Sequence, residues 1–127
     1  MFNGKESKKE LEQLVNASNN IGLGTIVTGN IVTKGNIRIE GEVIGNIETS
    51  AKISIGEEAV ITGNIIAQNA ELAGKVKGNV LVTELLILKP SSLVSGDIET
   101  AKLAVETGAT FNGKCKMHSQ EKVKNEK

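Results

Sequence analysis

The sequence predicts an all-β protein, a single-stranded parallel β-helix (a triangular β-solenoid) of about six coils. Two observations predict this fold class. A five-residue frame, apolar-x-Gly-x-apolar, occurs six times, with its glycines close to 17 residues apart. Between these glycines, apolar residues recur at every second position over short segments, as in strands that bury one face.

The glycine frame marks one point of each coil. Its glycines are 16, 18, 15, 18 and 17 residues apart, which is too close for a helix-pair repeat. Coils stacked at the strand spacing of about 4.8 Å would place equivalent apolar residues in inward columns. The first column contains Val27, Val43, Ile61, Val76, Val94 and Phe111, and the second contains Ile31, Ile47, Ile65, Val80, Ile98 and Cys115.

Between successive frame glycines, pairs of apolar residues predict a further strand in each coil. These pairs are Ile37/Ile39, Ile53/Ile55, Leu86/Leu88 and Leu103/Val105, with Leu72 and Gly74 in the degenerate third repeat. The residue after each frame glycine is expected to point outward. In this outer column Asn30, Asn46, Asn64 and Asn79 would stack as an amide ladder, followed by Asp97 and Lys114.

One domain accounts for the 127 residues. Residues 21–117 are expected to form the β-helix, residues 1–20 a flexible N-terminal tail, and residues 118–127 a disordered C-terminal tail because they are almost wholly polar. The core must consist of Ile, Val, Leu and Ala, since the chain has two Phe and no Tyr or Trp. The balance of 15 basic and 15 acidic residues argues against nucleic-acid binding.

The sequence offers no catalytic, metal-binding or cofactor-binding constellation. The single histidine, His118, falls in the expected tail, and Cys115 aligns with an inward column, which indicates a small buried hydrophobe. One cysteine and one histidine do not make a zinc site. Gly22–Gly24 departs from the dinucleotide-binding motif and precedes no helical pattern, so no nucleotide is expected. A lone cysteine and the lack of an apolar leader favour a cytoplasmic location.

Two other solenoid functions are alternatives. Apolar residues six apart, as at Ile31, Ile37 and Val43, also fit a left-handed hexapeptide-repeat acyltransferase, but this spacing ends after Ile65 and no histidine lies on the coils. A carbohydrate-binding solenoid would need an outward aromatic or threonine array, whereas the outward positions here are mixed.

The run TIVTGNIVTKGNIRIEGEVIGNI at residues 25–47, the recurring GNI and the closing GATFNGKCKM at residues 108–117 resemble the bactofilins, bacterial polymer-forming cytoskeletal proteins. The resemblance covers residues 21–117. It implies a right-handed β-helix that polymerises end to end without nucleotide, into filaments at the inner face of the cell membrane. It also implies that Phe111 acts in assembly and that Met1 and Phe2 belong to a membrane-targeting stretch.

An uncapped β-helix exposes its core and unpaired strand edges at both ends, and the residues after Met117 are too polar to cover one. We therefore expect a non-enzymatic scaffold protein whose main partner is itself. Membrane lipids, bound through the N-terminus, and recruited cell-envelope or morphogenesis proteins are further expected partners. The expected polymerisation interface comprises Phe111, Val105, Leu103 and Cys115 at one end and Ile21 and Leu23 at the other.

Overall fold

In the computed structural model, residues 18–118 are described, and they form fifteen β-strands and no helix. The first eight strands are β1 (Ser18–Ile21), β2 (Ile26–Thr28), β3 (Ile31–Thr33), β4 (Asn36–Ile39), β5 (Glu42–Ile44), β6 (Ile47–Thr49), β7 (Lys52–Ile55) and β8 (Val60–Thr62). They are followed by β9 (Ile65–Leu72), β10 (Lys75–Lys77), β11 (Val80–Leu88), β12 (Leu93–Ser95), β13 (Ile98–Val105), β14 (Thr110–Asn112) and β15 (Cys115–Met117).

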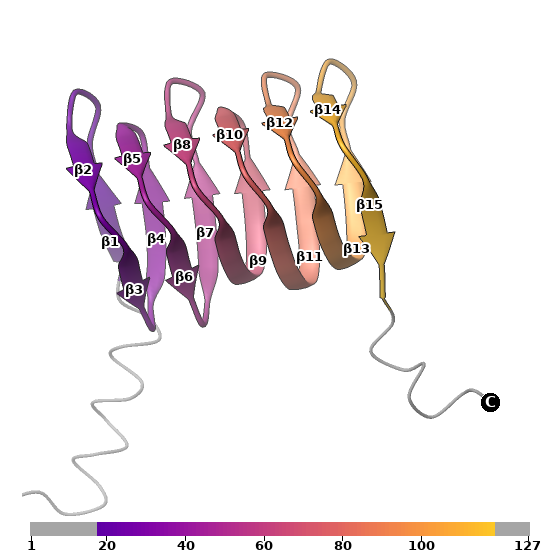
Figure 1. Cartoon of the computed structure of the whole chain (residues 1–127), viewed down its shortest axis with the longest axis horizontal. Coiled ribbons are helices and arrows are strands. Elements are labelled where there is room, and N and C mark those ends of the chain that lie inside the picture. Colours follow the sequence, from indigo (N-terminus) through magenta and orange to yellow (C-terminus); the bar gives the residue numbers. More distant parts are fainter. Residues whose placement is uncertain (1–17, 119–127) are drawn as a thin grey trace, which may run out of the picture.

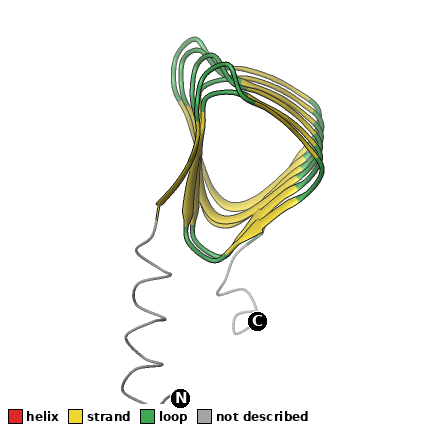
Figure 2. Ribbon diagram, turned by 90° about the vertical axis from the view of Figure 1, so that its left-hand side faces the viewer, coloured by secondary structure: helices red, strands yellow, loops and turns green. Residues whose placement is uncertain are grey.

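The chain winds as a rod of six coils with three faces, and its cross-section is a rounded triangle (Figure 2). One face is a six-stranded parallel sheet in the order β14-β12-β10-β8-β5-β2. A nine-stranded sheet covers the other two faces, because β9, β11 and β13 bend from one face to the next. In Figure 1 the far strands run upward and the near strands downward while the chain advances from left to right, so the coil is right-handed, as expected.

The strand register confirms both inward columns. Val43 pairs with Ile61, and Ile47 pairs with Ile65, one coil further along the chain. These four side chains have no exposed surface. A further inward column was not expected: Ala67 pairs with Val82, Val82 with Thr100 and Thr100 with Met117. Each frame tripeptide therefore recurs because it lies against its counterpart in the preceding coil.

The apolar pair of the third repeat differs from the expectation. The residue beside Leu72 in this pair is Ala70, which pairs with Ile53 on one side and with Leu86 on the other and is buried. Gly74 instead lies at a corner of the coil. An alanine at a position that other coils fill with isoleucine or leucine hid the period in the sequence.

Most of the variation in the spacing of the frame glycines comes from the corner between the first and second strands of each coil. Long corners span residues 22–25, 56–59, 89–92 and 106–109, and short ones span 40–41 and 73–74. Spacings of 16 and 15 residues contain the short corners, and Figure 1 shows the resulting high and low loops. Gly41 and Gly74 fit beneath the preceding long corner: a Cβ at Gly74 would lie 2.3 Å from the carbonyl oxygen of Gly56.

The outer asparagine column is held by bonds between side chain and backbone. The backbone N–H of Asn46 donates to Oδ1 of Asn30, that of Asn64 to Asn46, and that of Asn79 to Asn64, each at 2.9 Å. The predicted ladder is therefore present, but its bonds join side-chain oxygens to the next coil's backbone instead of stacking amide on amide. The N–H of Lys114 continues the series by donating to Asp97 Oδ1 at 3.2 Å.

The ordered rod extends slightly past the expected limits of residues 21 and 117. β1 begins at Ser18, where it pairs with Asn36. At the other end, the N–H of His118 donates to the carbonyl oxygen of Thr100 at 2.9 Å. Met1 and Phe2, the predicted membrane-targeting residues, lie outside the described residues.

Candidate functional site

The last coil presents a cross-section of the core. Leu103 and Phe111 are half-buried and pack against the core, while Val105 is 55% exposed. The equivalent of Phe111 one coil earlier, Val94, is completely buried. The predicted C-terminal residues thus lie together on one coil, where their inward columns end without a covering neighbour.

Cys115 was expected to be a buried hydrophobe, and this is wrong. Its register is as predicted, because Cys115 pairs with the buried Ile98. However, the cysteine is exposed because no strand of the described part of the chain lies beyond β15 to cover it. Its Sγ lies 3.8 Å from Sδ of Met117, which is 51% exposed.

Met117 belongs to the same terminal surface but was missed from the sequence. It lies in the same inward column as Thr100, with which it pairs. Because threonine is polar, this column does not stand out as apolar in the sequence. Thr100 is buried, with its hydroxyl 3.0 Å from the carbonyl oxygen of Lys102. The signal was available in principle, since Met117 follows Cys115 by two residues as Thr100 follows Ile98.

The first coil forms the opposite end of the rod. Ile21, Val27 and Ile31 are half-buried and pack against the core, whereas their equivalents in the second coil are buried. Leu23, in contrast, is 71% exposed in the corner at residues 22–25. It lines a surface hollow of about 430 Å³ together with Glu58 and other residues of later coils. The two predicted N-terminal residues therefore occupy different parts of this coil.

Both ends also expose strand edges. Within residues 18–118, the N-terminal strands β1, β2 and β3 each pair only with a strand of the second coil. At the C-terminal end, the described residues pair β14 only with β12, and β15 only with β13. Unpaired backbone donors and acceptors in a row form a template for another strand. Each end therefore combines apolar side chains with open hydrogen-bonding groups.

The single histidine of the described residues does not lie where the sequence predicted. His118 lies against the last coil, with Nδ1 3.6 Å from Glu99 Oε2, and not in a solvated tail as expected. Within residues 18–118, no three acidic, histidine or cysteine side chains are grouped so that they could hold a metal ion. That same part of the chain contains no helix suited to crossing a membrane.

This geometry defines a β-helical structural rod. The family model for bactofilin, described as polymer-forming cytoskeletal, matches residues 19–116, and the chain belongs to the bactofilin family. Bactofilins are structural proteins of the bacterial cytoskeleton and not enzymes. The acyltransferase alternative is therefore excluded, and the family assignment leaves no support for a carbohydrate-binding solenoid.

Individual relatives agree with this assignment. The chain is 30% identical to bactofilin BacO of Myxococcus xanthus, over 80% of this chain and 81% of BacO. It is 27% identical to BacP of the same organism, over 86% of this chain and 46% of BacP. The solid-state NMR structure of the cytoskeletal bactofilin BacA superposes with a TM-score of 0.69 at 28% identity, covering 84% of this chain and 99% of BacA.

Proposed function

We propose that this bactofilin assembles end to end through the terminal coils described above. The observation that carries the proposal is the change of burial along single columns. Val43, Ile61, Val76 and Val94 have no exposed surface, whereas Val27 and Phe111, at the two ends of the same column, remain partly exposed. A second copy docked at either end would complete the column.

The energetic contribution of such a junction is substantial. Covering the part of Phe111 that remains exposed stabilises by up to about 1 kcal/mol, and covering the more exposed Val105 and Met117 adds to this. The strand edges of β14 and β15 would gain hydrogen-bond partners at the same time. Together these terms oppose the entropy lost on association, which costs at least about 4 kcal/mol.

Assembly without nucleotide is part of the proposal. Phosphate-binding glycine loops work by directing backbone N–H groups and a helix N-terminus at the ligand. Gly22–Gly24 lies in a corner between β1 and β2, where no helix follows. The assembly energy would come entirely from the terminal surfaces.

Membrane attachment through Met1 and Phe2 would depend on assembly. Two apolar side chains give one subunit only a transient contact with a bilayer. A filament presents many copies of this segment, and the resulting avidity would hold the filament at the membrane as a scaffold for cell-envelope or morphogenesis proteins.

Electron microscopy of the purified full chain, without added nucleotide, tests the assembly. We expect filaments from the wild type and from Thr110→Arg, and short species from Phe111→Arg. Thr110 is the matched control because it precedes Phe111 in β14 and is exposed. Wild-type protein that stays monomeric at high concentration, or filaments of Phe111→Arg, would contradict the proposal.

Flotation with anionic liposomes tests the membrane contact. The wild type should float, whereas both the chain lacking residues 1–9 and Phe111→Arg should remain at the bottom of the gradient. Equal flotation of wild type and Phe111→Arg would show that attachment does not depend on assembly.

A further inference from the structure

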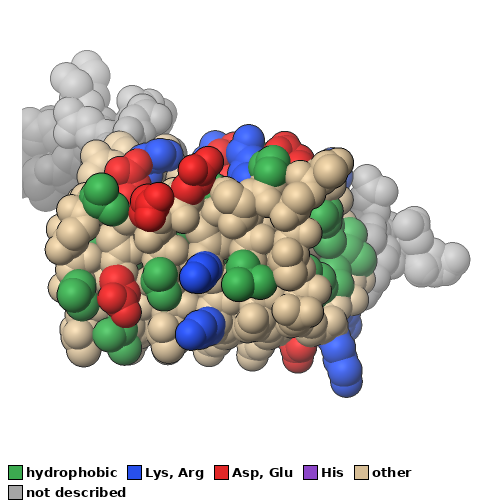
Figure 3. Space-filling model, turned by 90° about the horizontal axis from the view of Figure 1, so that it is seen from above, with side chains coloured by type: hydrophobic (Ala, Val, Ile, Leu, Met, Phe, Trp, Pro, Cys, Tyr) green, Lys and Arg blue, Asp and Glu red, His purple; other side chains and the backbone are tan. Residues whose placement is uncertain are grey.

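The six-stranded face of the rod carries a symmetric arrangement of charged and apolar side chains. Along the axis of the rod, two outward columns cross its strands (Figure 3). The strand register gives the first column as Ile26, Glu42, Val60, Lys75, Leu93 and Thr110. It gives the second as Thr28, Ile44, Thr62, Lys77, Ser95 and Asn112.

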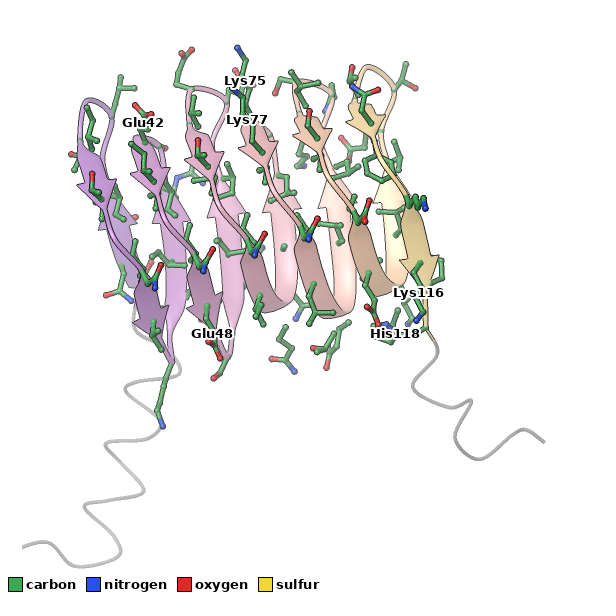
Figure 4. The ribbon with its side chains drawn as sticks, viewed as in Figure 1. Glu42, Glu48, Lys75, Lys77, Lys116 and His118 are labelled. Atoms are coloured by element: carbon green, nitrogen blue, oxygen red, sulfur yellow. The ribbon has the colours of Figure 1, made fainter. Side chains whose placement is uncertain are left out.

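The charges on this face have no partners within the rod. No ion pair in residues 18–118 involves Glu42, Lys75 or Lys77. Glu42 on β5 and Lys75 on β10 are separated by β8, which places them roughly 10 Å apart, too far for a direct contact. Figure 4 shows Glu42 and the two lysines on the same side of the rod.

Several apolar side chains of this face are exposed or partly exposed. Ile26 is 64% exposed and Ile44 is 42% exposed. Val60, at the centre, is partly exposed, as is Leu93 on β12. Water therefore contacts a band in which isoleucine, valine and leucine alternate with unpaired charges.

The first column is symmetric about Val60: on each side of it a charged residue comes first and an apolar residue second, and the two charges are opposite in sign. Counting outward from Val60 on β8, the first neighbours are Glu42 and Lys75, and the second are Ile26 and Leu93. A two-fold axis through β8, parallel to the strands, would place Glu42 of one copy against Lys75 of the other, twice. The same axis would bring Ile26 against Leu93 and Val60 against Val60.

We propose that this face binds the same face of a second copy, with the two rods antiparallel. Lys77 would lie against Ile44 in this arrangement, with its aliphatic stem covering the isoleucine and its ammonium group in water. In a parallel pairing, the Lys75 and Lys77 of one copy would meet those of the other, which is repulsive. Displacement of the antiparallel pair by one strand would separate Glu42 from Lys75.

The pairing rests on the proposed end-to-end assembly. Six strands of three residues present roughly 250 Å² in projection. A stable interface between two proteins typically buries about 800 Å² on each partner. Single subunits should therefore not pair, whereas filaments that repeat the face along their length should do so through avidity.

Negative-stain electron microscopy of charge-reversal variants of the full chain tests the inference. Wild-type filaments should lie in antiparallel pairs, and raising the salt concentration should separate them. Filaments of Glu42→Lys alone, or of Lys75→Glu alone, should remain single because like charges then face each other. The double variant Glu42→Lys/Lys75→Glu should pair again.

Mixing the two single variants gives the sharpest result. Filaments of Glu42→Lys should not pair among themselves, and neither should filaments of Lys75→Glu. When the two are mixed, they should pair with each other, because residues 42 and 75 of one filament then face residues 75 and 42 of the other with opposite charges. Glu48→Lys is the matched control, since Glu48 is exposed on β6 of a different face (Figure 4) and its reversal should leave the pairs intact.

The outcomes separate the two proposals. Single filaments of the wild type, persistent pairs of either single variant, or no rescue in the double variant and the mixture would overturn the lateral pairing alone. Absence of filaments from the wild type would overturn the end-to-end assembly and, with it, the pairing.

Discussion

The frame glycines offer a substitution pair that separates two physical effects. Gly63 and Gly29 occupy the same position in different coils, and both have a positive φ, of 150° and 128°. A Cβ on Gly63 would lie 2.0 Å from the carbonyl oxygen of Gly45, whereas a Cβ on Gly29 would meet nothing within 4 Å. Both alanine variants therefore suffer backbone strain, but only Gly63→Ala forces two coils apart.

The magnitudes follow from this geometry. A side chain held in this backbone region costs about 1 to 3 kcal/mol at either position. Relief of the clash at Gly63 requires the coils to separate by roughly 1 Å or more, which breaks bonds such as those from Gly45 N to Thr62 O and from Ile47 N to Asn64 O, both 2.9 Å long. Loss of two such bonds costs about 1 to 3 kcal/mol. We expect Gly63→Ala to lower the free energy of unfolding by about 2 kcal/mol more than Gly29→Ala.

Urea unfolding followed by far-ultraviolet circular dichroism measures this difference. Both substitutions should be made in a Phe111→Arg background, so that the compared species are not assembled. The free energy is taken from the midpoint and slope of each transition. Equal destabilisation by the two alanines would refute the argument that contact between coils makes glycine necessary in this column.

Three further predictions concern individual side chains. Asn64→Ala removes the acceptor of the Asn79 N–H and should lower the free energy of unfolding by about 1 kcal/mol in the same urea assay, whereas the exposed Asn112 changed to alanine should have almost no effect. Thr100→Val removes the buried hydroxyl that donates to the carbonyl oxygen of Lys102 and should lower the free energy of unfolding by about 1 kcal/mol, with an unchanged stability as the contrary result. Cys115 should react rapidly with a thiol reagent in Phe111→Arg monomers and much more slowly in wild-type filaments, and equal rates would argue against burial of the C-terminal end.

The sequence predicts the parts of the fold that depend on strict repetition. The columns headed by Val27 and Ile31 were predictable because a glycine marks their phase in every coil. Glycine is required at this position because the backbone of the preceding coil lies too close for a side chain, as at Gly63. Its recurrence in the sequence therefore follows directly from the stacking of the coils. Ala70 was missed because alanine fills an inward position without standing out among polar neighbours.

The exposure of the two ends of the rod was the part of the candidate site that was hardest to predict from the sequence. The sequence places Cys115 in a buried column, but burial depends on a following coil, and residues 18–118 contain none after β15. The prediction that Phe111 and Leu103 lie on the terminal coil needed only the register, and it is confirmed. The direction of the asparagine hydrogen bonds depends on side-chain torsion angles, which composition and spacing do not determine.

The alternation of long and short corners sets the unit by which this rod can change its length. Gly29 and Gly63 are 34 residues apart, and Gly45 and Gly78 are 33 apart, so one long-cornered and one short-cornered coil together make a module. Duplication of such a module preserves the fit of Gly74 beneath the corner at residues 56–59 and lengthens the rod by roughly 10 Å. Addition of a single coil instead places two corners of the same kind in succession, as with the long corners at residues 89–92 and 106–109, where a Cβ on Gly108 would lie 3.0 Å from the carbonyl oxygen of Pro90. Natural or engineered variation in rod length should therefore favour steps of two coils.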